Sequence, residues 1–206
     1  GLELLKKMTA MNPNHPMLEL VMAREINKNE VNFYAEKNAG LYSHNLDVLN
    51  KDYKIDSSKV QRIENESKTY FQSLLAFNAD LLKNKDLKEK AFWLTTAAYL
   101  HYIKGDYLAM EPLLVKAEDE KPKNPSLQNQ IKLFKTLYFL ETESINADEE
   151  TLLDQIASFK EVASFRDNNV LVLLTDKLSN KYLASKPVKS KSWLQSCFGS
   201  KPESIE

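Results

Sequence analysis

Two stretches of this chain, 109 positions apart, carry the same pattern. LELLKKMTAMNPNHPML at residues 2–18 returns as EPLLVKAEDEKPKNPSL at residues 111–127. The identical pairs are Leu4/Leu113, Leu5/Leu114, Lys7/Lys116, Pro13/Pro122, Pro16/Pro125 and Leu18/Leu127. Proline disfavours helical geometry in the residue before it, so each stretch predicts the end of one helix and the start of the next. A chain that repeats a helix end is constrained to a repetitive helical architecture.

Glycine is scarce in this chain. Only four glycines occur among 206 residues, and Gly1 and Gly199 lie near the ends. Hairpin turns depend on glycine, so the interior favours an all-α fold. The run VLVLL at residues 170–174 has the composition of a strand, but no convincing partner strand exists elsewhere. We interpret it as part of a buried helix from Asn168 to about Leu183.

Apolar spacing places several further helices along the chain. Residues 2–11 end a helix, a new helix starts near Pro16, and Ser57 and Ser58 can cap a long helix with one apolar stripe. The segment 91–105, AFWLTTAAYLHYIKG, is apolar on nearly all sides and must be covered on more than one of them. Asp106 can cap its successor, which stops before Pro122; Pro112 inside that helix predicts a bend or a late start.

The segment 91–124 resembles one tetratricopeptide repeat, a helix-turn-helix unit of about 34 residues. The matching positions are Ala98, Tyr99, Tyr102, the turn Gly105-Asp106-Tyr107, Ala117 and Pro122. Trp93, Met110 and Pro112 depart from the family pattern. Three units of about 36 residues account for the offset of 109.

This resemblance implies an α-solenoid, a right-handed superhelix of antiparallel helix pairs. Residues 1–184 would form a single helical-repeat domain, and residues 185–206 a tail with a short apolar knot. Leu2 to Met11 would be the second helix of a unit whose first helix lay upstream in a larger protein; a capping role is the alternative. The tail can fold back, stay flexible, or dock on a partner or a membrane surface.

Residues that carry chemistry are sparse and scattered. The three histidines, His15, His44 and His101, lie far apart without metal-ligand spacing, and Cys197 has no histidine nearby in sequence. No glycine-rich phosphate loop, GxSxG elbow or CxxC pair occurs. We therefore expect no enzyme activity, no catalytic residue, no cofactor and no metal.

Charge composition limits the class of partner. The net charge is −1, and Arg24, Arg62 and Arg166 are the only arginines among 28 basic residues, which argues against a nucleic-acid reader. No apolar run approaches the roughly 20 residues of a transmembrane span. The single cysteine favours the cytosol, although an extracytoplasmic protein with its signal removed would look the same. The lysine- and asparagine-rich composition favours a bacterial origin.

The functional expectation is a non-enzymatic protein-protein interaction module. By the resemblance, first helices of such repeats line a concave surface that holds a peptide. The candidate partner-binding residues are Thr95, Thr96, Tyr99, Tyr102, Asn129 and Lys132. The alternative is a structural or assembly domain that docks within its own larger chain or self-associates as a homo-oligomer. An all-helical enzyme is a third reading, which would need a pocket with converging polar groups.

Overall fold

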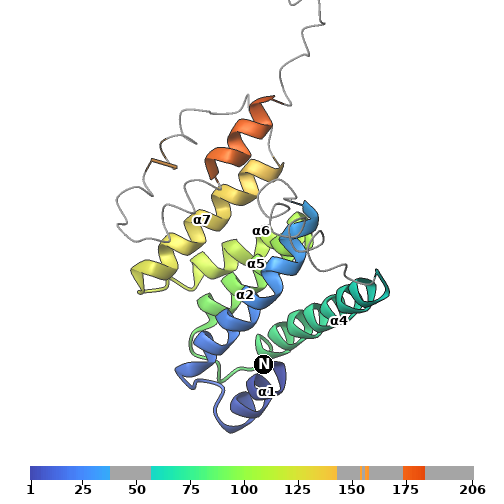
Figure 1. Cartoon of the computed structure of the whole chain (residues 1–206). Coiled ribbons are helices and arrows are strands. Elements are labelled where there is room, and N and C mark those ends of the chain that lie inside the picture. Colours follow the sequence, from blue (N-terminus) through green and yellow to red (C-terminus); the bar gives the residue numbers. More distant parts are fainter. Residues whose placement is uncertain (38–56, 143–153, 155, 158–173, 184–206) are drawn as a thin grey trace, which may run out of the picture. The chain divides into compact units, whose positions relative to one another are not determined.

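The computed structural model describes residues 1–37, 57–142, 154, 156, 157 and 174–183 (Figure 1). The chain divides into two compact units, Gly1–Tyr138 and Phe139–Glu206. All regular structure in the described residues is helical, which confirms the all-α expectation for them. Among them no helix combines the length and the apolar character that crossing a membrane requires.

The helix bounds follow the sequence signals closely. The helices are α1 (Leu2–Met11), α2 (Met17–Lys37), α4 (Ser57–Leu81), α5 (Lys90–Lys104), α6 (Tyr107–Asp119) and α7 (Pro125–Thr142). Thus α1 ends just before Asn12-Pro13, α4 begins at Ser57, and α6 ends before Pro122, as predicted. Proline accounts for the ends of α1 and α6, because it disfavours helical geometry in the residue before it.

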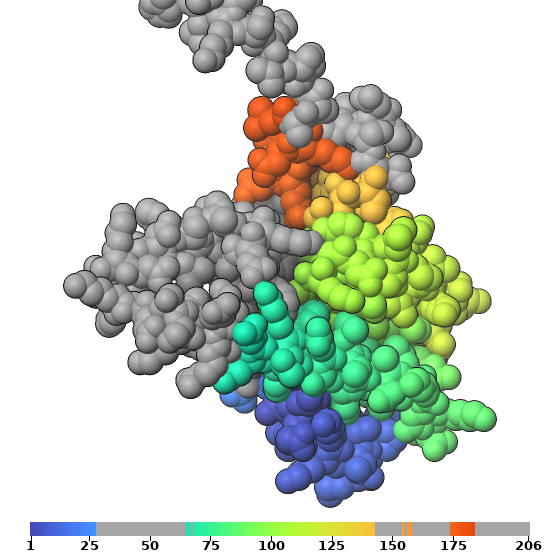
Figure 2. Space-filling view, turned by 90° about the vertical axis from the view of Figure 1, so that its right-hand side faces the viewer, coloured from blue at the N-terminus to red at the C-terminus, as the bar shows by residue number. Residues whose placement is uncertain are grey.

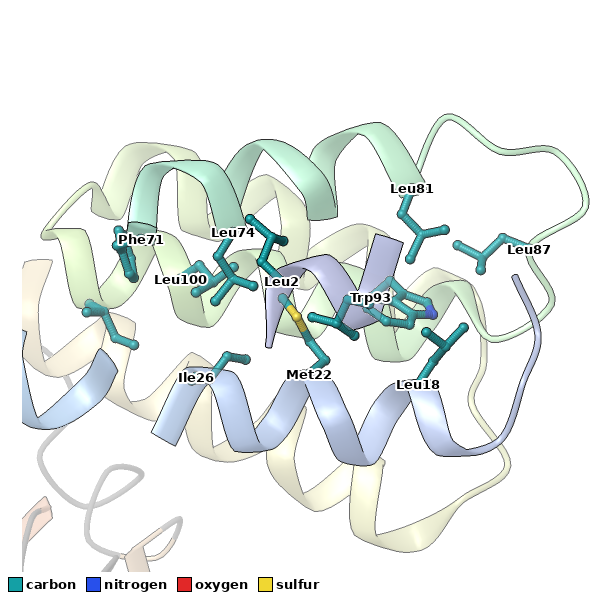
Figure 3. Packing of buried hydrophobic residues seen from close by; sticks show 12 residues of the cluster. Leu2, Leu18, Met22, Ile26, Phe71, Leu74, Leu81, Leu87, Trp93 and Leu100 are labelled. Carbon is teal, nitrogen blue, oxygen red and sulfur yellow. The ribbon is translucent and has the colours of Figure 1, made fainter. Parts of the chain in front are cut away.

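Helix α5 lies at the centre of the first unit, as its apolar character on all sides predicts (Figure 1). Trp93, Leu100 and Ile103 pack with residues of α1, α2 and α4 (Figure 3). Ala91 and Leu94 pack instead with α6 and α7, against Ala117, Leu127 and Ile131. Two apolar clusters therefore share α5, and burial on both sides stabilises it far more than helix propensity does.

The α5–α6 connection is a tight glycine turn. Gly105 has φ 79°, its N–H donates to the carbonyl of Tyr102, and the N–H of Asp106 donates to that of His101, both at 2.9 Å. This is the Schellman pattern, which favours glycine at the left-handed position. Helix α6 begins directly afterwards at Tyr107, so of the two effects expected from Pro112, a bend or a late start, the late start does not occur.

The repeated stretches occupy matching environments. Leu5 and its counterpart Leu114 are both fully buried, and Leu18 and Leu127 are both buried. Leu4 is exposed by half, whereas Leu113 is partly buried. Figure 2 shows α1 at one end of the unit beside α4. Two of the three common leucine pairs, Leu5 with Leu114 and Leu18 with Leu127, therefore have one structural role, which is to face the interior.

In the second unit the described residues are few. Residues 174–183 are helical, and Leu174, the last residue of VLVLL, is fully buried. The Nζ of Lys181 donates to the carbonyl of Leu140 at 2.6 Å, and Lys177 pairs with Glu141. The rest of the VLVLL run and the tail 185–206 lie outside the described residues.

Candidate partner-binding groove

A groove of about 900 Å³ opens at the start of α5. It is lined by residues 13–16 of one repeated turn (residues 12–16, the first turn), by residues 120–124 of the other (the second turn) and by the segment 88–93. We call it the turn groove. Helices α2, α5 and α7 all begin there, at Met17, Lys90 and Pro125. Two segments that share a sequence pattern thus line one hollow.

The first turn is fastened to the segment before α5. Asn14 donates from Nδ2 to the carbonyl of Asp86 and accepts at Oδ1 from the N–H of Lys88, both at 2.8 Å. The Nδ1 of His15 accepts the N–H of Met17 at 3.2 Å, which satisfies a donor at the start of α2. Hydrogen bonds to backbone on both sides hold this wall in place.

The second turn is fastened mainly to its own following helix. The Oδ1 of Asn124 accepts the N–H of Ser126 at 3.0 Å, and Gln128 donates to the carbonyl of Pro122 at 2.7 Å. Asn124 is the counterpart of His15 in the repeated pattern. In both turns the side chain of this residue accepts the backbone N–H of the residue two positions later, at the start of the next helix. The hydrogen bonds that hold the second turn therefore join residues close to one another in the sequence.

The second turn also contains a left-handed residue. Lys121 has φ 50°, the one positive φ at a non-glycine position among the described residues. It follows the end of α6, where a left-handed residue is usually glycine, and its N–H donates to the carbonyl of Glu118 at 2.9 Å. A side chain there costs conformational energy that glycine would avoid.

Apolar side chains lie between the two turns. Phe92 is partly buried, packs against both apolar clusters, and meets Trp93 edge to face with ring centroids 5.1 Å apart. Leu18 lines the groove from α2 and Leu127 from α7. An apolar base between polar, hydrogen-bonded walls is the usual composition of a binding site.

Acidic and basic side chains both line the groove: three glutamates, Glu19, Glu89 and Glu120, and four lysines, Lys88, Lys90, Lys121 and Lys123. Burial, reinforced by the neighbouring Glu89 carboxylate, raises the pKa of Glu19. Lys121 and Lys123 belong to the second turn, and Lys88 and Lys90 flank the start of α5. In the described part of the chain none of these four lysines and none of the three glutamates forms an ion pair. Their charges are therefore available to a ligand.

The residues predicted from sequence lie elsewhere. Thr95, Thr96 and Tyr102 are buried, and the Oγ1 of Thr95 donates to the carbonyl of Ala91 at 2.7 Å. Tyr99 is partly buried and stacks on Phe134 with ring centroids 4.6 Å apart. These four residues pack inside the unit rather than on a free surface.

The two α7 candidates are more accessible but lie away from the groove. Asn129 is partly buried and Lys132 is exposed. None of the six predicted residues lines the turn groove. No local pattern in the sequence located the groove; the repeated turns that line it were interpreted as helix ends and as a mark of the repeat period.

A buried carboxylate lies near the start of the chain. Glu25 is 3% exposed and accepts from the hydroxyl of Tyr70 at 2.6 Å; that hydroxyl in turn accepts the N–H of Leu2 at 2.8 Å. Burial, together with the hydrogen bond to Glu25, raises the pKa of Tyr70 to about 12. This network joins α1, α2 and α4 and has a structural role.

Among the described residues, no group of three or more histidine, cysteine or acidic side chains is placed to hold a metal ion. Comparison of the sequence with protein-family models found no match, and comparisons with curated proteins and with solved structures found none either. The function is therefore argued from the groove alone.

Proposed function

We propose that this chain is a non-enzymatic interaction module of tetratricopeptide-like helix pairs, which holds an extended segment of a partner protein in the turn groove. The observation that carries the proposal is that both copies of the repeated turn line the same groove. A volume of about 900 Å³ falls within the range of ligand sites and suits a few residues of peptide.

The fixed walls support this proposal. Asn14, His15, Asn124 and Gln128 all use their side chains to hold backbone, so the groove exists before a partner arrives. A preformed site loses less conformational entropy on binding than a site that must order itself. The solenoid arrangement belongs to this proposal as well, supported by the matching burial of Leu5 with Leu114 and of Leu18 with Leu127.

A display library of random ten-residue peptides, selected on the purified chain, tests the groove. Gln130 is exposed on α7 and lines the groove, so Gln130→Trp should fill it and weaken selected peptides by at least about tenfold. Lys132→Trp is the matched control, because Lys132 is exposed on the same helix outside the groove.

Two outcomes would count against the groove. Failure to select any peptide would remove the proposed function. Loss of binding in Lys132→Trp but not in Gln130→Trp would move the site to the face of α7 that the sequence favoured.

Assembly is the second candidate function, and one observation favours it. Met11, Met17 and Leu20, at the junction of α1 and α2 and on the first turns of α2, are exposed by 87%, 47% and 60%. Exposed apolar side chains that gather in one region can mark a protein interface. Light scattering of the chain and of Met11→Lys/Leu20→Lys tests it: a dimer that dissociates in the variant supports assembly, and a monomer in both contradicts it.

A further inference from the structure

We infer that Trp93 fixes the register of the segment held in the turn groove, because its indole N–H donates a hydrogen bond to a backbone carbonyl of that segment. This inference rests on the proposed function and adds the residue that positions the partner. Its basis is a donor without a partner, the place of that donor at the groove, and the engagement of the acceptors on the first turn.

The indole N–H of Trp93 has no hydrogen-bond partner among the described residues. The residue is only 2% exposed, and Asn78 of α4 donates from Nδ2 to its backbone carbonyl at 3.0 Å, a bond that does not involve the indole. A buried tryptophan usually pairs its N–H. A donor left unpaired on a buried side chain therefore points to an acceptor that arrives from elsewhere.

The donor can be reached from the groove, which Trp93 lines. In the described part of the chain, the fully enclosed side-chain polar atoms without a partner are the Oγ1 of Thr9 and the Oδ1 of Asn78, so the Nε1 of Trp93 is not enclosed. Figure 3 shows the indole nitrogen, in blue, at the end of the ring toward Leu87 and Leu18. Leu18 lines the groove and Leu87 directly precedes its lining segment 88–93.

The acceptors on the first turn are already in use. The Oδ1 of Asn12 accepts the N–H of Asn14 at 2.9 Å, and the Oδ1 of Asn14 accepts the N–H of Lys88 at 2.8 Å. The Nδ1 of His15 accepts at the start of α2. Turning one of these side chains toward Trp93 would break a bond that holds the turn. A bound segment is the remaining source of an acceptor.

A backbone carbonyl of an extended segment suits this donor. The indole is held in place by the apolar cluster of α1, α2, α4 and α5 and by the edge-to-face contact with Phe92. An extended segment presents a carbonyl at every residue, about 3.3 Å apart along the chain, and each carbonyl that leaves water needs a donor. A fixed donor therefore favours the register that places a carbonyl on it. Partly buried Phe92 is left to an apolar side chain of the same segment.

The indole signal of Trp93 in NMR spectra of the full chain tests the inference. Trp193→Phe leaves Trp93 as the one tryptophan, so a single indole N–H signal remains. A ten-residue peptide selected on the chain should shift that signal and slow its exchange with solvent. If the signal stays unchanged while the amides of Asn14 and Ser126 shift, the inference is overturned and the groove remains.

Ester substitution in the peptide identifies the acceptor. Each peptide amide is replaced in turn by an ester, whose carbonyl accepts more weakly. At one position this should weaken binding to the wild-type chain by about twofold to tenfold, the effect of one hydrogen bond, and binding to Trp93→Phe by much less. The ester also removes a peptide N–H, but that loss is common to both chains and cancels. Equal losses in both chains at every position would overturn the inference.

Phe71→Leu is the matched control for Trp93→Phe. Phe71 is buried in the same apolar cluster and does not line the groove, so this variant should keep the ester pattern of the wild type. Loss of the pattern in Phe71→Leu as well would assign it to looser packing and overturn the inference. If Trp93→Phe does not fold, the indole signal alone decides. Selection of no peptide, or binding that Gln130→Trp does not affect, would overturn the proposed function together with the inference.

Discussion

The two repeated turns agree in their helix starts and differ in their helix ends. His15 and Asn124 cap the following helices in the same way, although one is an imidazole and the other an amide. The preceding helices end differently: Asn12 is extended at φ −157°, whereas its counterpart Lys121 is left-handed at φ 50°. The agreement lies in buried and capping positions, and the difference lies in the backbone of the residue that follows each preceding helix.

The turns also differ in how they are held. The first turn is tied through Asn14 to residues more than 70 positions away, and the second through Gln128 to a residue six positions away. A long-range tie couples the first turn to the packing of α5, whereas the second turn can keep its shape locally. One sequence pattern is therefore stabilised by tertiary structure at one site and by local structure at the other.

The largest expected effect tests whether the two copies are equivalent in the core. Leu5→Ala and Leu114→Ala each remove a fully buried side chain, and each should lower the free energy of unfolding by about 2–5 kcal/mol. Leu4→Ala, at a position that is exposed by half, should cost much less. Chemical denaturation measures all three. A loss at only one of the two buried leucines would break the equivalence.

Tyrosine–glutamate pairs provide the next comparison. Tyr70 bonds buried Glu25 at 2.6 Å, and Tyr138 bonds exposed Glu111 at 2.9 Å. Tyr70→Phe should cost about 1–3 kcal/mol because it removes a donor from a buried carboxylate. Tyr138→Phe should cost less than about 1 kcal/mol, since water can replace the lost bond. Equal losses of stability in the two variants would show that burial of the glutamate does not matter.

The Tyr70 pair also predicts a pH dependence. Its pKa of about 12 lies above the ordinary value of 10, so the neutral hydroxyl is favoured by the fold. Its contribution to stability is complete below pH 10 and is lost as the pH rises through about 12. Wild type should therefore lose more stability than Tyr70→Phe across this window, as followed by circular dichroism. Parallel losses would contradict this assignment.

Because the two turns are held by different hydrogen bonds, we expect mutations in them to lower stability by different amounts. Asn14→Ala removes two hydrogen bonds to backbone and should cost about 1–2 kcal/mol. Gln128→Ala removes one exposed bond and should cost less than about 0.5 kcal/mol. Thermal unfolding of both variants measures the contrast, and a larger cost for Gln128→Ala would reverse it.

The smallest expected effect tests the shared helix cap. His15→Ala and Asn124→Ala each remove a side-chain acceptor at a helix start and should each cost about 0.5–1 kcal/mol. His15→Asn should restore the cap in the first turn. Failure of asparagine to restore stability there would show that the two caps are not equivalent.

Much of the fold could be predicted from local sequence signals. The proline-marked ends of α1 and α6, the start of α4 at Ser57 and the all-round burial of α5 follow from backbone restrictions and apolar spacing. Pro112 was expected either to bend α6 or to delay its start. The loss of its N–H did not delay the start of α6.

The candidate site was not predictable, because it depends on tertiary contacts. Thr95 and Tyr102 look accessible on an isolated helix, but packing on both sides of α5 buries them. Tyr99 stacks on Phe134 of α7, a contact that depends on how α5 and α7 pack. The groove itself requires two turns 109 positions apart to meet, and no local pattern determines that.

Amide NMR of the chain during titration with a ten-residue peptide selected on it tests the central claim most directly. A peptide in the turn groove should shift the signals of both turns together, at Asn14 and Met17 and at Lys121 and Ser126, and that of Lys90 between them. Shifts confined to one turn, or centred on Lys132 of α7, would contradict the account.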